Sequence, residues 1–419
     1  MSYFRTAHRH DSDVDISTIG FWQQDFPTRD RAFARLRAES PVSWHPPLQT
    51  PGLPKRAWEA GFWAVTTAHD VAHVSRHPDL FSSAIGQVSV RPAPYRLTPN
   101  MLVLDPPAHS EYRKIVGSAF TPKAVARLET GIRNRAKRIV LRAAAHDEFD
   151  FVTTVAAQMP LRTVAELIGV PHDEVDHFVE AADAYVSTRI PAQLPPGVSA
   201  EMFIAARGEY LQALCAELAA ERRDQPHDDL MTALVEARVE GAALTEEQIF
   251  STVVLLVVAG DDTTKQAITL SYLALQHFPD QREWLMADYD NRFDIAFDEL
   301  VRYASPVLSF ARTAMNDTEL GGKHIAAGDK IALFYCSANR DETIFTSPAD
   351  LDLARHPNHH QAFGGGGVHF CLGNTLARAQ VKAILGEVLQ RLPDATPGDP
   401  VFQFNDAVHA VAELPIRVR

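Results

Sequence analysis

The fold is decided by Phe363-Gly364-Gly365-Gly366-Gly367-Val368-His369-Phe370-Cys371-Leu372-Gly373. Four glycines precede a single cysteine, and a run with apolar residues at helical spacing follows it. The pattern predicts that Cys371 stands where a glycine loop meets a helix start. The N–H groups and dipole of a helix start favour an anion, so we expect the thiol to lose its proton readily. A thiolate beside an open, flexible loop suits an axial ligand of haem iron.

A glycine turn that merely precedes a buried cysteine would have the same local sequence. The rest of the chain is therefore needed to distinguish a haem ligand from a packing residue. The 419 residues are 46% hydrophobic, and no linker or sharp change in composition divides them. We therefore expect one large, mainly helical domain over residues 1–419, with a polar segment over 1–25. The net charge of −13 argues against nucleic acid as the main partner.

The three cysteines are too few and too far apart for a disulfide framework or a paired-cysteine zinc site. We expect Cys215 and Cys336 to be inert packing residues and the protein to be cytoplasmic. The N-terminus has no signal peptide pattern, and the longest apolar run, 253–259, is too short to cross a bilayer. We expect no membrane anchor.

A long helix is predicted from Thr245 to His277. Thr245 and Gln248 form a capping box, and no proline follows before Pro279. Its middle, 255–260, is apolar on every side, which predicts burial. The next four residues, 261–264, are Asp-Asp-Thr-Thr, poor helix formers whose burial costs free energy unless they are paired. This conflict points to a functional site.

Other elements follow from local patterns. We expect a strand over 61–65, a helix that starts at Asp105-Pro106-Pro107, a continuous helix over 152–168, a helix over 293–303 and strands between 310 and 335. An irregular stretch, 339–361, leads into the glycine loop, and a helix follows Cys371. The segments 82–99 and 190–197 are predicted to be loops of the kind that bind ligands.

Three motifs in this order resemble the cytochrome P450 family of haem-thiolate monooxygenases: Ala259-Gly260-Asp261-Asp262-Thr263-Thr264, Glu299-x-x-Arg302 and the cysteine loop. Further stretches match the family at Phe310-Ala311-Arg312, Ala338-Asn339-Arg340-Asp341 and Asp352-Leu353-Ala354-Arg355. The resemblance covers the chain from about Asp25 to its end. It implies a mainly α fold with a smaller β region, in which a long central helix lies over the haem.

The resemblance has one departure. The commonest form of the cysteine signature has phenylalanine seven residues before the cysteine, whereas Phe363 lies eight before Cys371. The loop thus carries one extra glycine, as in some bacterial relatives that oxidise sterols and branched lipids. We expect the shape of the loop and the packing of Phe363 on the haem to differ from the common pattern.

The resemblance implies the following roles around haem b. Cys371 ligates the iron as a thiolate, and the N–H of Gly373 bonds the sulfur. Asp262 and Thr263 are the acid–alcohol pair that delivers protons to bound oxygen, while Ala259 and Gly260 leave space for it. The alternative for the pair is a polar patch at a helix kink without a proton role.

Two charged clusters complete the expected site. Glu299, Arg302 and Arg355 form a buried structural triad that pins the cysteine loop, and the last is a candidate chosen from the irregular stretch. His109, Arg113, Arg312 and His369 contact the haem propionates; ordinary surface side chains are the alternative. A metal site built from His356, His359, His360 and His369 is a rival interpretation, but its spacing fits no zinc pattern.

The resemblance also implies partners. We expect a hydrophobic small molecule, such as a sterol, terpenoid, lipid or secondary metabolite, together with O2. The chain has no flavin or nicotinamide fingerprint, so a separate ferredoxin or flavodoxin must supply electrons, docking near Lys114 and Arg378. One of Arg91, Arg96 and Arg189 is a candidate for binding a substrate carboxylate, although a solvated loop charge is the simpler alternative. A monomer is expected.

The expected activity is insertion of one oxygen atom into a C–H bond or an alkene. Two alternatives stay open. The first is oxidation driven by peroxide, and the second is a haem-binding sensor or ligand carrier without turnover.

Overall fold

The computed structural model describes residues 12–49, 61–86, 88–91, 99–186, 198–239 and 241–418. Its α-helices are α1 (Ile19–Trp22), α2 (Phe26–Glu39), α3 (Ala68–Arg76), α4 (Ala108–Gly117), α5 (Pro122–Ala143), α6 (Phe151–Thr154), α7 (Pro160–Ile168), α8 (Val175–Val186), α9 (Ala200–Asp224), α10 (Leu230–Glu236), α11 (Glu246–His277), α12 (Pro279–Met286), α13 (Tyr289–Ala304), α14 (Tyr335–Ala338) and α15 (Asn374–Arg391). Its strands are β1 (Val42–His45), β2 (Phe62–Val65), β3 (Phe81–Ser82), β4 (Glu148–Asp150), β5 (Arg238–Val239), β6 (Ala242–Ala243), β7 (Ser309–Ala314), β8 (Thr318–Leu320), β9 (Lys323–Ile325), β10 (Lys330–Phe334), β11 (Thr396–Pro397), β12 (Val401–Phe402), β13 (Val411–Glu413) and β14 (Pro415–Arg417).

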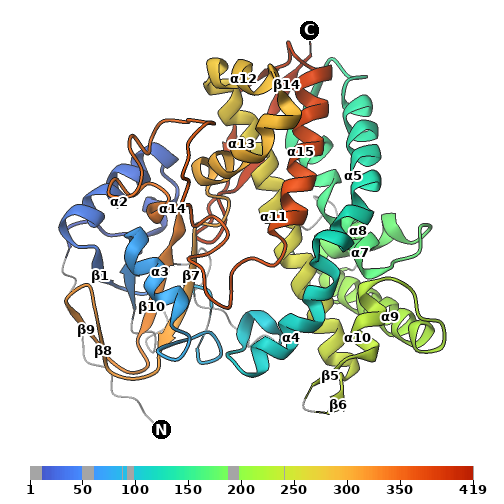
Figure 1. The fold of residues 1–419 in the computed structure, drawn as a ribbon, viewed down its shortest axis with the longest axis horizontal. Coiled ribbons are helices and arrows are strands. Elements are labelled where there is room, and N and C mark those ends of the chain that lie inside the picture. The colour runs from blue at the N-terminus through green and yellow to red at the C-terminus, as the bar shows by residue number, and fades with distance from the viewer. Residues whose placement is uncertain are drawn as a thin grey trace.

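A larger helical part and a smaller sheet part make up the molecule (Figure 1). The main sheet has the strand order β1-β2-β10-β7-β3. β10 runs parallel to β2 and antiparallel to β7, which places Ala332 beside both Ala64 and Ala311. α2, α3 and α14 lie with this sheet, and α5, α11, α13 and α15 lie together in the helical part (Figure 1). The predicted fold class, mainly α with a smaller β region, is confirmed.

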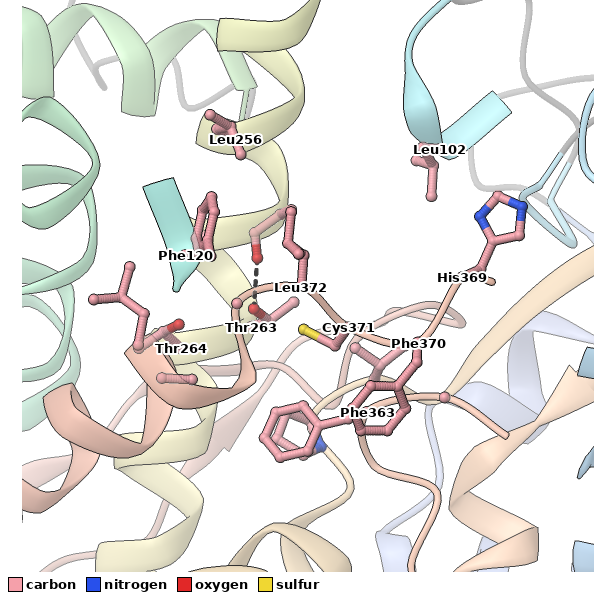
Figure 2. Close-up of a pocket in the computed structure, with 18 of the residues that line it drawn as sticks. Leu102, Phe120, Leu256, Thr263, Thr264, Phe363, His369, Phe370, Cys371 and Leu372 are labelled. Carbon is pink, nitrogen blue, oxygen red and sulfur yellow. Dashed lines mark hydrogen bonds between the residues drawn. The ribbon is translucent and has the colours of Figure 1, made fainter. Parts of the chain in front are cut away.

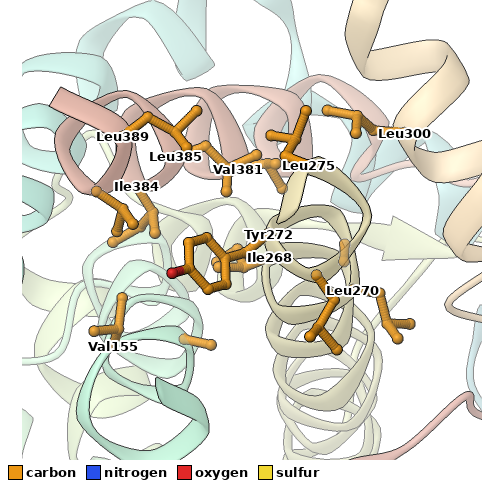
Figure 3. Packing of buried hydrophobic residues seen from close by; sticks show 14 of the residues in the cluster. Val155, Ile268, Leu270, Tyr272, Leu275, Leu300, Val381, Ile384, Leu385 and Leu389 are labelled. Carbon is orange, nitrogen blue, oxygen red and sulfur yellow. The ribbon is translucent and has the colours of Figure 1, made fainter. Parts of the chain in front are cut away.

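α11 is the predicted long helix, and its capping box between Thr245 and Gln248 is formed. Its second half packs against α15, where Ile268 and Leu275 lie among apolar side chains such as Val381 and Leu385 (Figure 3). The predicted burial of 255–260 on all sides is wrong at one face, because Val258 is 45% exposed and Ala259 is exposed as well. In the described part of the chain, every helix is too short or too polar to span a membrane.

The expected continuous helix over 152–168 is wrong. The chain forms α6, a 3₁₀ turn over Ala156–Gln158 and then α7. Pro160 stands at the first position of α7, where its missing N–H costs nothing, whereas inside a longer helix it would break a hydrogen bond. The predicted loop over 190–197 lies outside the described residues.

A buried ion pair fixes the irregular stretch that precedes the cysteine loop. Glu299 and Arg302 on α13 have fully buried side chains and bond through two contacts of 2.7 Å each. Arg355 donates to the same carboxylate at 3.0 Å, so the expected third arginine makes the contact. Asn358, which the sequence did not single out, donates at 3.0 Å. Burial raises the pKa of Glu299, but the bonds from Arg302 outweigh it and the net pKa is lowered.

The same arginine bonds the backbone of the irregular stretch. Arg302 donates to the carbonyl oxygens of Asn339, Pro348 and Asp350 at 2.8, 2.9 and 3.0 Å. The backbone N–H of Asp352 donates to Glu299 at 3.0 Å. These bonds attach a segment without helix or strand to α13.

Replacing Glu299 by glutamine should destabilise the protein strongly, because it leaves two buried guanidinium groups without a counter-charge. We expect the free energy of unfolding to fall by about 3–5 kcal/mol, measured by urea denaturation. Asp294→Asn on the same helix is the matched control, since that side chain is 66% exposed; it should change the value by less than about 0.5 kcal/mol. Equal effects of the two substitutions would contradict the structural role of the triad.

Candidate active site

Cys371 lies three residues before the first residue of α15 and two before its N-cap, Gly373, so it stands at the helix start as predicted. The N–H of Cys371 donates to the carbonyl of Phe363 at 2.9 Å, and the side-chain amide of Asn374 donates to the carbonyl of Cys371 at 2.8 Å. These bonds at both ends hold the loop closed around the cysteine. The sulfur points into a cavity that Thr263 also lines, from α11 (Figure 2).

The glycine run packs against the end of α3. Gly364, Gly366 and Gly367 have φ of +100°, +92° and +75°, a region that other residues rarely adopt. A Cβ on Gly367 would lie 2.3 Å from the carbonyl oxygen of Ser75. The loop therefore requires glycine both for its backbone conformation and for its close contact with the backbone of α3. Phe363 packs with its ring 6.0 Å from that of Phe297, centroid to centroid.

The acidity expected of the Cys371 thiol is not found in the protein chain alone. Burial raises the pKa of Cys371, and the Gly373 N–H and the Arg113 charge lower it by less. The helix start thus acts in the predicted direction but is outweighed by desolvation. Metal coordination displaces the thiol proton, which makes the thiolate a property of the metal-bound state.

α11 forms the opposite wall of the cavity through Ala259, Gly260, Thr263 and Thr264. The Thr263 hydroxyl donates to the carbonyl of Ala259 at 2.6 Å (Figure 2). A Cβ on Gly260 would approach Val164 of α7 to 2.9 Å. Glycine here therefore lets α7 pack closely against α11, besides leaving the cavity open.

Lys265 explains how α11 tolerates two adjacent aspartates. The sequence alone does not single it out, because a lysine in a helix usually points to water. Its ammonium lies 2.5 Å from Asp262 and 3.6 Å from Asp261. The side chains of Lys265 and Asp261 are 1% and 2% exposed, whereas that of Asp262 is 37% exposed. Asp261 is thus a buried counter-ion, and Asp262 is the carboxylate that water can reach.

Four basic residues lie along one side of the cavity: His109, Arg113, Arg312 and His369. The rings of His109 and His369 are 4.2 Å apart. Burial, then the charge of Arg113, lowers the pKa of His109 to about 4. Burial, then the charge of Arg312, lowers the pKa of His369 to about 3. Both rings are therefore neutral near pH 7.

None of these four side chains forms an ion pair with a carboxylate of the described residues. Among the described residues, Arg312 donates only to the carbonyl of Ala311, at 2.8 Å, and Arg113 only to that of Phe370, at 2.7 Å. His109 Nδ1 and His369 Nε2 are buried and have no hydrogen-bond partner in the described structure. A buried guanidinium, a second that is partly exposed and two unsatisfied ring nitrogens beside a cavity fit an anionic ligand such as the carboxylates of haem.

Two other predicted roles are not supported by the contacts. Arg91 pairs with the buried carboxylate of Asp406, so it is not a free charge for a substrate; Arg96 and Arg189 lie outside the described residues. Arg378, expected at a docking surface, bonds Asp298 at 2.6 Å and stacks on Phe297. Among the described residues, no group of three or more histidine, cysteine, aspartate or glutamate side chains is placed so that it could hold a metal ion.

Comparisons with known proteins agree with this geometry. The cytochrome P450 family model matches residues 60–406. A methyl-branched lipid omega-hydroxylase of Mycobacterium tuberculosis is 39% identical over 416 residues, which cover 97% of this chain and 94% of the relative. A steroid C26-monooxygenase of Mycolicibacterium smegmatis is 36% identical, with 92% and 89% covered.

Solved structures show the same similarity. A Mycobacterium marinum cytochrome P450 in complex with pseudoionone has a TM-score of 0.90 and 45% identity, covering 98% of this chain and 100% of its own. A Bacillus megaterium cytochrome P450 in complex with corticosterone has a TM-score of 0.80 and 27% identity, with 93% and 97% covered. The chain therefore belongs to the cytochrome P450 family.

Proposed function

We propose that this cytochrome P450 monooxygenase holds haem b through Cys371 and oxidises a hydrophobic molecule with O2 and two electrons from a separate donor. The observation that carries the proposal is the position of the Cys371 sulfur in a cavity that faces Thr263 on α11. When bound, haem supplies the oxygen chemistry, and a thiolate ligand favours O–O cleavage. Residues 1–419 are proposed to form one domain, as a monomer in the cytoplasm.

Thiolate ligation is tested by the spectrum of the reduced, CO-bound protein. The wild type should give the red-shifted Soret band of a thiolate-ligated haem, and Cys371→Ser should lose that band. Cys336→Ser is the matched control, because Cys336 is buried in the sheet part and its pKa is raised to about 12 by burial. A red-shifted band that survived in Cys371→Ser would contradict the proposal.

Proton delivery is assigned to Asp262 and Thr263. Asp262 is open to water and is held by Lys265, and the next residue along α11 lines the cavity with its hydroxyl. The hydroxyl oxygen of Thr263 donates to Ala259 and can still accept a hydrogen bond. A carboxylate that exchanges protons with water, next to a hydroxyl that relays them, suits stepwise protonation of bound oxygen.

Asp262→Asn should slow product formation by about 10²-fold, because an amide cannot supply the proton. Substrate affinity, read from the shift in haem spin state, should stay unchanged. Glu246→Gln, an exposed change in the first turn of the same helix, is the control. An unaffected rate would contradict the acid role. It would also favour the peroxide-driven alternative, which needs no such acid, whereas absence of product with the wild type would favour a sensor or carrier without turnover.

Propionate binding is assigned to Arg312, Arg113, His109 and His369. Arg312→Met should speed haem loss to an acceptor protein by about 10- to 100-fold, since charge-assisted hydrogen bonds contribute about 1.5–3 kcal/mol. Arg417→Met is the control, because that side chain is 72% exposed and pairs with Glu148 at the surface. Equal rates of haem loss in the two variants would contradict the assignment.

The substrate is proposed to be a lipid, steroid or terpenoid-like molecule. The described walls of the cavity above Thr263 include Leu102, Leu255, Leu256, Val307 and Phe310, which are apolar. The relatives named above act on methyl-branched lipids and steroids, which are hydrophobic as well. The donor is proposed to be a ferredoxin or flavodoxin. Lys114, which is exposed, suits its docking better than the paired Arg378.

A further inference from the structure

A second, polar cavity of about 140 Å³ lies between the N-terminal helices and the segment 402–410. Its described walls come from the end of α1, from α2 and from that C-terminal segment. A single water molecule needs only about 10–15 Å³ on this measure, so the space holds several waters or one small ion. It is separate in its lining from the cavity of Cys371.

Arg29 lines this cavity with an unpaired charge. The residue is 6% exposed, and its guanidinium lies 5.5 Å from the ring centroid of Trp22 and 5.7 Å from that of Phe26. It makes no hydrogen bond or ion pair with any described residue, and its Nε is completely buried. Burial lowers the pKa of Arg29. A buried cation of this kind is costly unless a counter-charge meets it.

His409 lines the same cavity and is 5% exposed. Its Nδ1 lies 3.0 Å from the carbonyl of Ala304, which can only accept, so Nδ1 carries the proton of the neutral ring. Nε2 is then an acceptor, and it is buried without a partner in the described structure. Burial, then the charge of Arg29, lowers the pKa of His409 to about 3, which keeps the ring neutral.

The rest of the described lining adds donors and no acid. Side-chain amides come from Gln23, Gln24, Gln403 and Asn405. The Asn405 carbonyl already accepts from the N–H groups of Ala407 and Val408, which leaves its NH₂ as a donor. Of the neighbouring acids, Asp25 caps α2 and offsets only part of the cost of burying Arg29, and Asp406 pairs with Arg91 through one carboxylate oxygen.

We propose that this cavity binds one small oxyanion of the phosphate type that carries an acidic proton. Arg29 donates to its charged oxygens, and its acidic O–H donates to Nε2 of His409. The side-chain amides that line the cavity donate hydrogen bonds to the remaining oxygens of the ion. Val408 pairs with Val307, a residue of the cavity above Cys371, so the ion would fasten the segment that forms this wall.

The test is calorimetric titration of inorganic phosphate into the haem-loaded full chain at slightly acidic pH, with ionic strength held constant by sodium chloride. Wild type should bind one phosphate per chain. Arg29→Met should weaken binding at least about tenfold, because a charge-assisted hydrogen bond is lost. Arg31→Met, an exposed arginine on the same helix, should bind as the wild type does.

Thermal unfolding gives a second measurement. Phosphate should raise the unfolding midpoint of the wild type and of Arg31→Met but not that of Arg29→Met. Two further variants keep the proposal testable if Arg29→Met does not fold. His409→Gln should weaken phosphate binding, and Arg29→Lys should keep part of it. Absence of saturable binding to the wild type, or equal binding by Arg29→Met, would overturn the proposal. Because neither measurement uses turnover, the result does not depend on the monooxygenase assignment.

Discussion

The buried bond between Glu299 and Arg302 is the constraint on which the position of the cysteine depends. Two opposite charges without access to water must neutralise each other, and each of their remaining N–H groups and oxygen atoms needs a hydrogen-bond partner. Arg302 does so by bonding carbonyls of a segment that has no helix or strand of its own. Asn339 belongs to that segment, and its side chain accepts from the N–H of Gln361 at 2.7 Å, just before the glycine loop. A continuous set of hydrogen bonds thus runs from α13 toward Cys371.

Local signals made much of this fold predictable. The capping box of α11, the glycine run and the Glu299–Arg302 spacing each act through neighbours in sequence, and each is formed as expected. The break between α6 and α7 was equally local, since Pro160 marks it, but the apolar periodicity on both sides concealed it. Quantities that depend on burial could not be predicted. The pKa of Cys371 is the sharpest example, because the cost of desolvation exceeds the effect of the helix start.

Charge partners were the least predictable part of the site. A sequence cannot tell a solvated arginine from a paired one, and Arg91 and Arg378 both proved to be paired with aspartates from distant segments. Two buried arginines that have no ion-pair partner in the described structure instead line cavities. Arg312 lies at the larger cavity and Arg29 at the smaller one. A buried cation without an ion-pair partner is costly for the folded chain alone, and this is the physical reason for associating each with an anion.

Lys265 shows how one residue can divide two adjacent aspartates between different tasks. Positions three and four apart lie on the same face of a helix, so one ammonium group reaches both Asp262 and Asp261. The buried carboxylate gains a counter-charge that lets α11 keep its helical path through the core. The carboxylate of Asp262, which is 37% exposed, is held next to Thr263 in the sequence and remains in contact with water. A lysine at this position therefore both permits the acidic pair inside the helix and determines which of its members can exchange protons with solvent.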